Sequence, residues 1–279
     1  MTGPEATAPA HRGTLTPLRI AVCAKQVADP DTPPSRFKVD QSTNRVVFPP
    51  SASPVVNGFD LQAVEAALKI REAAGVDEIV VISVGHKFAN DVMKKALSMG
   101  ADRLVLVNDP AATDLDAAVT VKALAGALGK LGPFDLILCG RQASDLDQAQ
   151  VPIGLAEVLG LPLVTLARAV DLNGTRAIIE RVISDGHQVI ETPLPAVVTV
   201  SNELGEPRYP TLRGIMAAGR KMPEVLSLAD VGIAGASPVM NLVTLRIPER
   251  SASVELMDGA DGPDKGRRLA VALRGAGLI

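Results

Sequence analysis

The sequence contains almost no aromatic residues: no Trp, one Tyr and five Phe among 279 residues. Proteins that bind nucleic acids by base stacking need exposed aromatic side chains, so this class of binding protein is excluded. The net charge of −3 gives no electrostatic footprint for nucleic acid or an anionic membrane surface. The core must be built from Val, Leu, Ile and Ala, which is typical of an α/β protein with buried parallel strands.

Cysteine and histidine are also scarce. The two cysteines, Cys23 and Cys139, lie far apart in the chain, which excludes a disulfide framework and a CxxC redox pair. With only three His and two Cys, we expect no structural zinc site. No run of about 18 uncharged apolar residues occurs, so no membrane insertion is predicted. Residues 1–17 lack the apolar core of a signal peptide, and we predict a disordered tail and a cytoplasmic protein.

Short apolar segments alternate with helical patterns from residue 18 to about residue 160. The predicted strands are 18–24, 78–84, 103–107 and 135–139, and the predicted helices are 57–72, 89–99, 113–130 and 151–159. Asn57 is expected to cap the first helix, and Thr113 and Asp114 to begin the third. The proline-rich segment 25–54 is predicted to be a loop with an edge pairing around 45–48. Such alternation predicts an α/β fold with a doubly wound, mainly parallel, Rossmann-like sheet.

The pattern changes in the second half of the chain. Segments 167–172 and 175–183 flank Asn173–Gly174, a strong hairpin signal, and 196–200 is again an apolar strand. We therefore predict an antiparallel hairpin addition within a nucleotide-binding domain spanning 18–221. Residues 222–279, which end in a helix at 264–274, form an extended C-terminal arm. The arm either folds back on the domain or wraps a partner subunit.

The loop at 140–150 is the most informative segment for function. Ligands of open α/β sheets bind outside the carboxyl ends of the strands, and this loop follows a strand and precedes a helix. Asp145 and Asp147 could form an acid pair, bind a metal or cap the loop and the following helix; Gln148 and Gln150 suit phosphate or ribose. Walker A and GxGxxG motifs are absent from the sequence. Physical reasoning therefore stops at a nucleotide-binding α/β domain without catalytic residues, in which His86 is an ordinary loop histidine.

Several blocks of the sequence are similar to one family. They are AVCAKQVADP, VNGFDLQAVEAALKI, ALSMGADR, CGRQASDLD and LPAVVTV followed by EPRYPTLRGIM. From residue 18 to residue 279 the chain resembles the beta subunits of electron transfer flavoproteins. The resemblance implies a partner alpha subunit that shares FAD with the chain. It also implies electron transfer from flavin dehydrogenases to a quinone reductase or another acceptor. The chain would then be an electron carrier and not an enzyme, because redox activity resides in the bound flavin.

The resemblance also implies functional residues. The family's beta subunit holds an adenine nucleotide, and the corresponding positions here are Cys23, Asn57, Phe59, Val84, Asp145, Asp147, Gln148, Ala149, Gln150 and Val151. Leu212 corresponds to an apolar anchor that docks partner dehydrogenases, with Arg208 and Tyr209 beside it. Otherwise, Leu212 would pack under its own loop. A basic residue of the family's docking segment is replaced by Ala217.

The resemblance leaves the identity of the beta nucleotide open. Ala149-Gln150-Val151 resembles the branch that holds a second FAD and bifurcates electrons, whereas Leu146 and Gln148 depart from that branch. The site therefore takes a second FAD, AMP or neither, and bifurcation stays open. The alternative function is a stand-alone adenine-nucleotide-binding regulator of the universal-stress type, which shares the α/β plan. An ATP-dependent hydrolase or ligase would need a phosphate-gripping motif that the sequence lacks.

Overall fold

The computed structural model describes residues 17–113, 115–248 and 254–279. The predicted N-terminal tail therefore lies outside the described residues, apart from Pro17, and so does Asp114. The chain divides into two compact units. The larger runs to Lys38 and from Val46 to Val243, and the smaller combines Val39–Arg45 with Thr244–Ile279.

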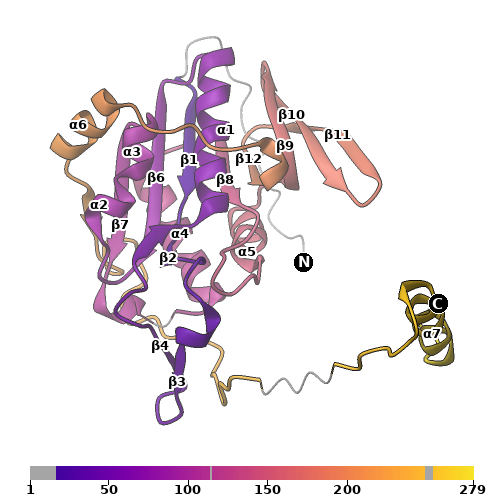
Figure 1. Ribbon diagram of the computed structural model, residues 1–279. Helices are drawn as coiled ribbons and strands as arrows, with labels where there is room; N and C mark the ends of the chain where they lie inside the picture. Colours follow the sequence, from indigo (N-terminus) through magenta and orange to yellow (C-terminus); the bar gives the residue numbers. More distant parts are fainter. Residues whose placement is uncertain (1–16, 114, 249–253) are drawn as a thin grey trace, which may run out of the picture. The chain divides into compact units, whose positions relative to one another are not determined.

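A nine-stranded sheet forms the centre of the larger unit, in the order β11-β10-β9-β12-β8-β1-β6-β7-β13 (Figure 1). Its strands are β1 (Arg19–Cys23), β6 (Glu78–Gly85), β7 (Arg103–Asn108), β8 (Leu136–Gly140), β9 (Leu163–Asn173), β10 (Arg176–Ile183), β11 (Gly186–Pro193), β12 (Ala196–Val200) and β13 (Glu224–Leu226). Neighbours pair in parallel except β9 with β10 and β10 with β11. The predicted fold class, a mainly parallel sheet with an antiparallel addition, is confirmed.

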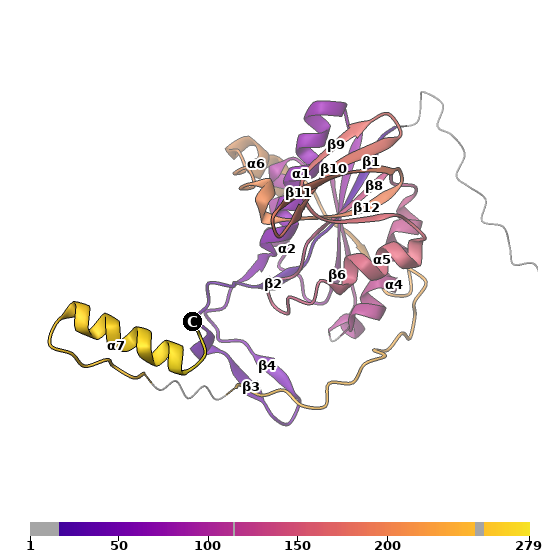
Figure 2. The same ribbon diagram turned by 90° about the vertical axis from the view of Figure 1, so that its right-hand side faces the viewer.

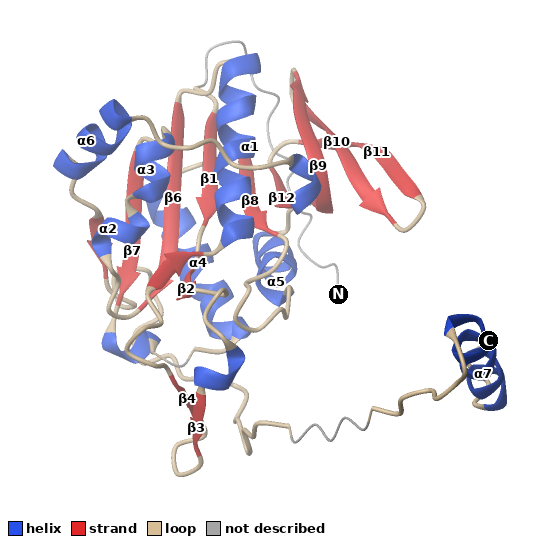
Figure 3. Cartoon of the chain, in the orientation of Figure 1, coloured by secondary structure: helices blue, strands red, loops and turns tan. Residues whose placement is uncertain are grey.

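Helices cover both faces of this sheet (Figures 2 and 3). One face packs against α1 (Gly58–Ala74), α2 (Asn90–Met93) and α3 (Lys95–Met99), and the other against α4 (Ala117–Leu131) and α5 (Gln150–Leu159). Alternation along the strands separates the two cores: Ile20 and Val22 of β1 face the first core, and Ala21 and Cys23 face the second. The central strands are apolar on both faces because both are covered.

Three helix and turn boundaries differ from the prediction. Lys94 interrupts the expected helix 89–99, which becomes α2 and α3. The next helix begins at Ala117, because the carboxylate of Asp116 accepts the N–H of Val119 and caps α4. In the β9–β10 hairpin, Asn173 pairs with Arg176, so Gly174 and the residue after it form the turn instead of Asn173–Gly174.

The segment predicted as a loop at 25–54 contains short pairings. Strand β2 (Gln26–Ala28) pairs antiparallel with β5 (Pro54–Val56), a pairing that the prediction missed. Strand β3 (Lys38–Asp40) pairs with β4 (Arg45–Val47), which confirms the edge pairing predicted near residue 45. A short 3-10 turn, η1 (Pro34–Arg36), lies between the two pairs.

The chain after β12 continues through η3 (Asn202–Leu204) and α6 (Leu212–Arg220) to β13. Strand β13 adds to the sheet edge beside β7, and the N–H groups of Val239 and Met240 donate to the Asp116 carboxylate at 2.7 and 2.9 Å. Residues 224–243 thus belong to the larger unit, and the smaller unit resumes at Thr244, not at 222. In that unit α7 (Gly262–Gly275) is capped by Asp261 and has no buried residue.

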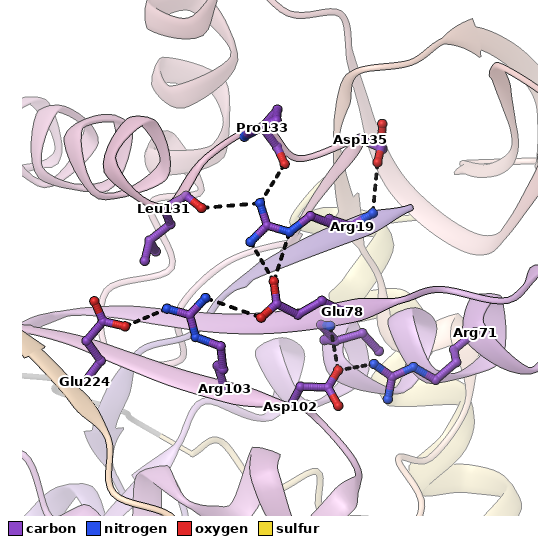
Figure 4. A network of polar contacts seen from close by, with 10 residues as sticks. Arg19, Arg71, Glu78, Asp102, Arg103, Leu131, Pro133, Asp135 and Glu224 are labelled. Carbon is purple, nitrogen blue, oxygen red and sulfur yellow. Dashed lines mark hydrogen bonds and ion pairs between the residues drawn. The ribbon is translucent and has the colours of Figure 1, made fainter. Parts of the chain in front are cut away.

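An ionic network joins the amino ends of four strands (Figure 4). Glu78 of β6 accepts from Arg19 of β1 at 2.6 Å and from Arg103 of β7 at 3.3 Å. Arg103 also pairs with Glu224 of β13 at 2.6 Å, and the N–H of Arg19 donates to Asp135 at 2.8 Å. This network therefore holds the strands together at their amino ends, away from the carboxyl ends where ligands of such sheets bind.

Replacing Glu78 with Gln should lower the free energy of unfolding by about 1 kcal/mol at neutral pH, the value of a charge-assisted hydrogen bond reduced for partial exposure. Burial raises the pKa of Glu78, but the hydrogen bonds from Arg19 and Arg103 together lower it by more than burial raises it. The pKa of Glu78 therefore lies below its ordinary value. A depressed pKa stabilises the fold above the unfolded value, and this stabilisation is lost as the pH falls through the folded pKa. Urea unfolding should therefore show a difference that disappears in acid.

The matched control for this prediction is Glu157→Gln, which alters an exposed glutamate of α5. It should change the unfolding free energy by less than about 0.5 kcal/mol. Equal effects of the two variants would contradict a role for the network in stability.

Candidate functional site

Asn57 links the start of α1 to the loop after β8. It is buried and occupies the expected N-cap position, but its side chain does not cap α1. Instead, its Nδ2 donates to the carbonyl of Gln142 at 2.8 Å, and its Oδ1 accepts the N–H of Ser144 at 3.1 Å. The prediction of a capping side chain was wrong, because the distant loop competes for the same amide and provides both a donor and an acceptor.

Asp60, which the sequence reasoning missed, joins the carboxyl ends of the two central strands. Its Oδ2 accepts the N–H of Lys25 at 2.7 Å, beyond β1, and its Oδ1 accepts the N–H of Gly140 at 3.1 Å, at the end of β8. Burial raises the pKa of Asp60 to about 7, although hydrogen bonds from Lys25, Asn57 and Gly140 act in the opposite direction. The sequence signal was an acidic residue in the first helical turn, next to the strand ends.

A salt bridge and internal hydrogen bonds shape the loop between β8 and α5. Lys25 Nζ lies 2.7 Å from Asp145 Oδ2, and Gln142 Nε2 donates to Asp147 Oδ1 at 2.9 Å. The two aspartates thus hold the loop, as one of the predicted alternatives stated. Neither caps α5, however, because the N-cap position belongs to Ala149 and no side chain caps the helix.

The backbone of this loop leaves the amino end of α5 open. Asp147 and Ala149 both adopt left-handed conformations, with φ of 50° and 53°. The first N–H groups of a helix have no partner within the helix, and here those of Gln150 and Val151 receive no side-chain cap. Together with the helix dipole, such N–H groups favour an anion such as a phosphate. The exposed side chain of Gln148 lies next to this opening in the chain.

The predicted site residues Cys23 and Val84 lie in the last part of their strands. Cys23 and Cys139 are buried, free thiols at paired positions of β1 and β8, and Val84 is partly buried near the end of β6. A hydrogen bond with Cys23 raises the pKa of Cys139, and burial and the Asp60 charge raise it further. Cys139 is therefore a protonated thiol, suited to packing instead of nucleophilic attack.

A cavity of about 380 Å³ lies beside Asn57 and Phe59, and Arg208 and Tyr209 also line it. It thus brings residues predicted to bind a cofactor together with residues predicted to dock a partner. Two further lining groups, Gln62 Oε1 and Ser144 Oγ, are buried and have no hydrogen-bond partner among the described residues. A buried polar atom without a partner is costly, so a ligand or partner with complementary polar groups would fit here.

The predicted docking residues separate into two kinds. Leu212 is 75 % exposed and Tyr209 93 % exposed, so Leu212 does not pack under its own loop. It is also the first residue of α6, with Ile215 and Met216 exposed on the same helix face. Arg208, in contrast, points inward and binds two glutamates of α1.

Two kinds of site are not found in the part of the chain that the structure describes. No group of three or more His, Cys, Asp or Glu side chains there could hold a metal ion. Within the same residues, no helix has the length and apolar character needed to cross a bilayer.

Comparison with known proteins identifies one family. The model of the electron transfer flavoprotein domain matches residues 51–231. The chain is 38 % identical over 213 residues to electron transfer flavoprotein subunit beta of Thermoanaerobacterium thermosaccharolyticum, covering 76 % of this chain and 79 % of the relative. It is 35 % identical over 254 residues to the subunit beta of Megasphaera elsdenii, covering 86 % and 91 %. It is also 37 % identical over 216 residues to the caffeyl-CoA reductase-Etf complex subunit CarD of Acetobacterium woodii, covering 77 % and 80 %.

Gly140 is the position at which the site tolerates no side chain. A Cβ there would lie 2.7 Å from the backbone carbon of Phe59, and closer still to Asp60 Oδ1. Gly140→Ala must therefore separate β8 from α1, and we expect urea unfolding to show a loss of about 1–3 kcal/mol. The control is Gly129→Ala in α4, where a Cβ meets nothing within 4 Å. It should be neutral or stabilising by up to about 1 kcal/mol. Similar stabilities of both variants would show that Asp60 does not hold the strand ends.

Proposed function

The chain belongs to the electron transfer flavoprotein family as a beta subunit, and from this premise we propose that it forms half of a heterodimer that carries electrons. Its partner is the alpha subunit, its donors are flavin dehydrogenases, and its acceptor is a quinone reductase or another redox protein. FAD, shared with the alpha subunit, supplies the redox chemistry when bound. The protein's own residues bind and orient nucleotides and partners, so the chain is a carrier and not a catalyst.

One observation carries the nucleotide part of the proposal: the amino end of α5 has no side-chain cap and follows the loop that leaves the carboxyl end of β8, whose neighbours in the sheet are β1 and then β6. The N–H groups of Gln150 and Val151 bind a phosphate of the nucleotide, with Gln148 and Asp147 beside it. Ala149 leaves space next to this phosphate. Cys23 and Val84 form an apolar wall for the adenine, while Asn57 and Asp145 keep the loop in place.

The nucleotide in the beta site is an adenine nucleotide, and we assign it as a second FAD with AMP as the alternative. Leu146 departs from the second-flavin branch, but its side chain is 64 % exposed. This exposure supports the second FAD, because Leu146 then does not occupy the space of a ligand inside the loop. The Acetobacterium woodii relative is named as a subunit of a caffeyl-CoA reductase-Etf complex. Bifurcation in this chain follows only if the beta site holds a flavin.

The C-terminal arm at 222–279 is the proposed contact with the alpha subunit. The part of this arm that belongs to the smaller unit has exposed apolar residues: Val254, Leu256, Val271, Leu278 and Ile279. Exposed apolar surface of this extent is typical of an interface. Leu212 and Tyr209 dock the dehydrogenase at a different part of the chain, the start of α6. The alternative, a stand-alone regulator of the universal-stress type, is not favoured by the family match.

The proposal is tested by expressing the chain together with its alpha subunit. We expect a yellow heterodimer that releases two FAD molecules on acid treatment, because each subunit contributes one nucleotide site. Release of one FAD and one AMP would replace the second flavin by AMP and exclude bifurcation. Gln150→Ala keeps the backbone N–H but removes the side-chain amide that suits phosphate or ribose, so it should weaken retention of the beta nucleotide while the alpha FAD stays bound. Gln188→Ala, on the exposed strand β11, should change neither. A chain that forms no heterodimer would contradict the proposed function.

The docking role is tested by Leu212→Ala in the heterodimer. Removal of an exposed interface anchor should weaken the encounter with the dehydrogenase by about 1–3 kcal/mol and leave the flavin spectrum unchanged. Electron acceptance is measured as kcat/KM for the heterodimer as substrate. The control is Val189→Ala, which trims another exposed aliphatic side chain on β11, at the opposite edge of the sheet. Equal rates for both variants would rule out the anchor.

A further inference from the structure

Arg208, in the segment before α6, forms a cluster of hydrogen bonds with α1, in addition to the hydrogen bond from Lys69 Nζ of α1 to the carbonyl of Leu204 at 3.2 Å. The backbone N–H of Arg208 donates to Glu65 Oε2 at 3.1 Å. Its guanidinium donates to both oxygens of Glu65, at 2.8 and 3.0 Å, and to Glu72 Oε1 at 2.5 Å. Glu65 and Glu72 lie two helical turns apart, so both face the same side of α1. The single side chain of Arg208 therefore binds α1 at two positions that are two turns apart.

The burial of Glu65 makes this contact demanding. Glu65 is only 4 % exposed, and a buried carboxylate is costly unless it is paired and hydrogen-bonded. The planar guanidinium satisfies both carboxylate oxygens at once, which an ammonium group cannot do with the same geometry. The hydrogen bonds from Glu65 and Glu72 raise the pKa of Arg208 above its ordinary value, so the charge is permanent. These features are those of an internal fastening.

The position of α6 depends on this fastening at its amino end and on contacts of the helix itself, among them a hydrogen bond from Lys94 Nζ to the carbonyl of Gly219 at 3.2 Å. Thr211, three residues after Arg208, caps α6 by accepting the N–H of Gly214 at 3.1 Å. On the inner side of the helix, a Cβ at Gly214 would overlap the carbonyl oxygen of Ser98 in α3, so α6 crosses α3 at close contact. Ala218 is buried on the same side. The outer side then presents Leu212 and its exposed neighbours Ile215 and Met216.

We propose that Arg208 is a positioning residue and not a docking residue. Its clasp on Glu65 and Glu72 sets the place and angle at which α6 presents Leu212, Ile215 and Met216 to an apolar pocket of a dehydrogenase. This inference rests on the proposed docking function of α6. It reassigns Arg208, which the family resemblance placed among the docking residues, because its donors are already bound within the chain.

The test uses the heterodimer with its alpha subunit and four variants. They are Arg208→Gln, Arg208→Lys, Glu65→Gln and the double variant that combines Arg208→Gln with Glu65→Gln. Amide hydrogen–deuterium exchange in residues 205–220 should be faster in every variant. The kcat/KM for electron acceptance should fall at least fivefold in Arg208→Gln and Glu65→Gln, mainly through KM. The double variant should be no worse than the poorer single variant, because both changes break one contact. Lysine should restore little, since it cannot bind both oxygens of Glu65.

The matched control is Arg213→Gln, which removes an exposed positive charge of α6 itself. A direct charge contact changes the dependence of the encounter on ionic strength, so this variant can alter the salt dependence without altering exchange. Arg208→Gln should do the reverse. Arg208→Gln could instead reduce the dependence of kcat/KM on ionic strength, and its effect on kcat/KM could multiply with that of Glu65→Gln. Both results together would show that Arg208 contacts the partner, and they would overturn the inference. Unchanged exchange in Arg208→Gln also overturns it.

Leu212→Ala separates this inference from the proposed function. If Leu212→Ala slows electron acceptance and Arg208→Gln does not, the positioning role is wrong while docking through α6 stands. If neither variant slows it, the docking function of α6 fails and the inference fails with it. Glu65→Gln and Arg208→Lys are the mildest changes, and they provide the same readouts should Arg208→Gln not fold.

Discussion

The site depends on the carboxylate of Asp60, which binds the N–H groups of Lys25 and Gly140 with its two oxygens. These N–H groups lie where β1 and β8 end, so one side chain at the start of α1 fixes the helix against the two strands between which the site opens. Gly140 has to be glycine, because a side chain there would occupy the space of Asp60 and Phe59. The loop that follows Gly140 is then held by Asn57 and by the salt bridge between Lys25 and Asp145.

Different interactions hold the strands together at the two ends of the sheet. At the amino ends, Arg19, Glu78 and Arg103 are partly exposed and form ion pairs that water also reaches. At the carboxyl ends, Asn57 and Asp60 are buried and bind backbone groups. The salt bridge between Lys25 and Asp145 adds a charged contact to these backbone contacts, and burial raises the pKa of Asp60 to about 7. The ionic network of Arg19, Glu78 and Arg103 therefore lies at the end of the sheet opposite to the proposed nucleotide site.

The sequence was sufficient to predict those features of the fold that depend on residues close together in the chain. The alternation of strands and helices, the parallel sheet and the antiparallel hairpin follow from local apolar patterns, and the loop at 140–150 is where such a sheet binds ligands. It was insufficient where a distant group competes. Asn57 has the pattern of a helix cap, but Gln142 and Ser144 take its side chain. Asp116 displaces Thr113 as the start of α4. Asp60 looks like an ordinary acid of a first turn until the strand ends are brought together, and the place where the arm departs depends on the contacts of Asp116 with Val239 and Met240.

A carrier of electrons must hold a nucleotide in one place and meet its partner in another, and α1 serves both requirements. Its first turn holds the strand ends and the loop through Asn57 and Asp60, and its next turns hold the segment before α6 through Glu65 and Glu72. The proposed nucleotide site and the proposed docking helix therefore both contact the same helix of 17 residues. The cavity between them, with Phe59 on one wall and Tyr209 on another, is the space that this helix leaves open. Helix α1 therefore connects the two proposed functional regions through different turns, Asn57 and Asp60 at one end and Glu65 and Glu72 further along.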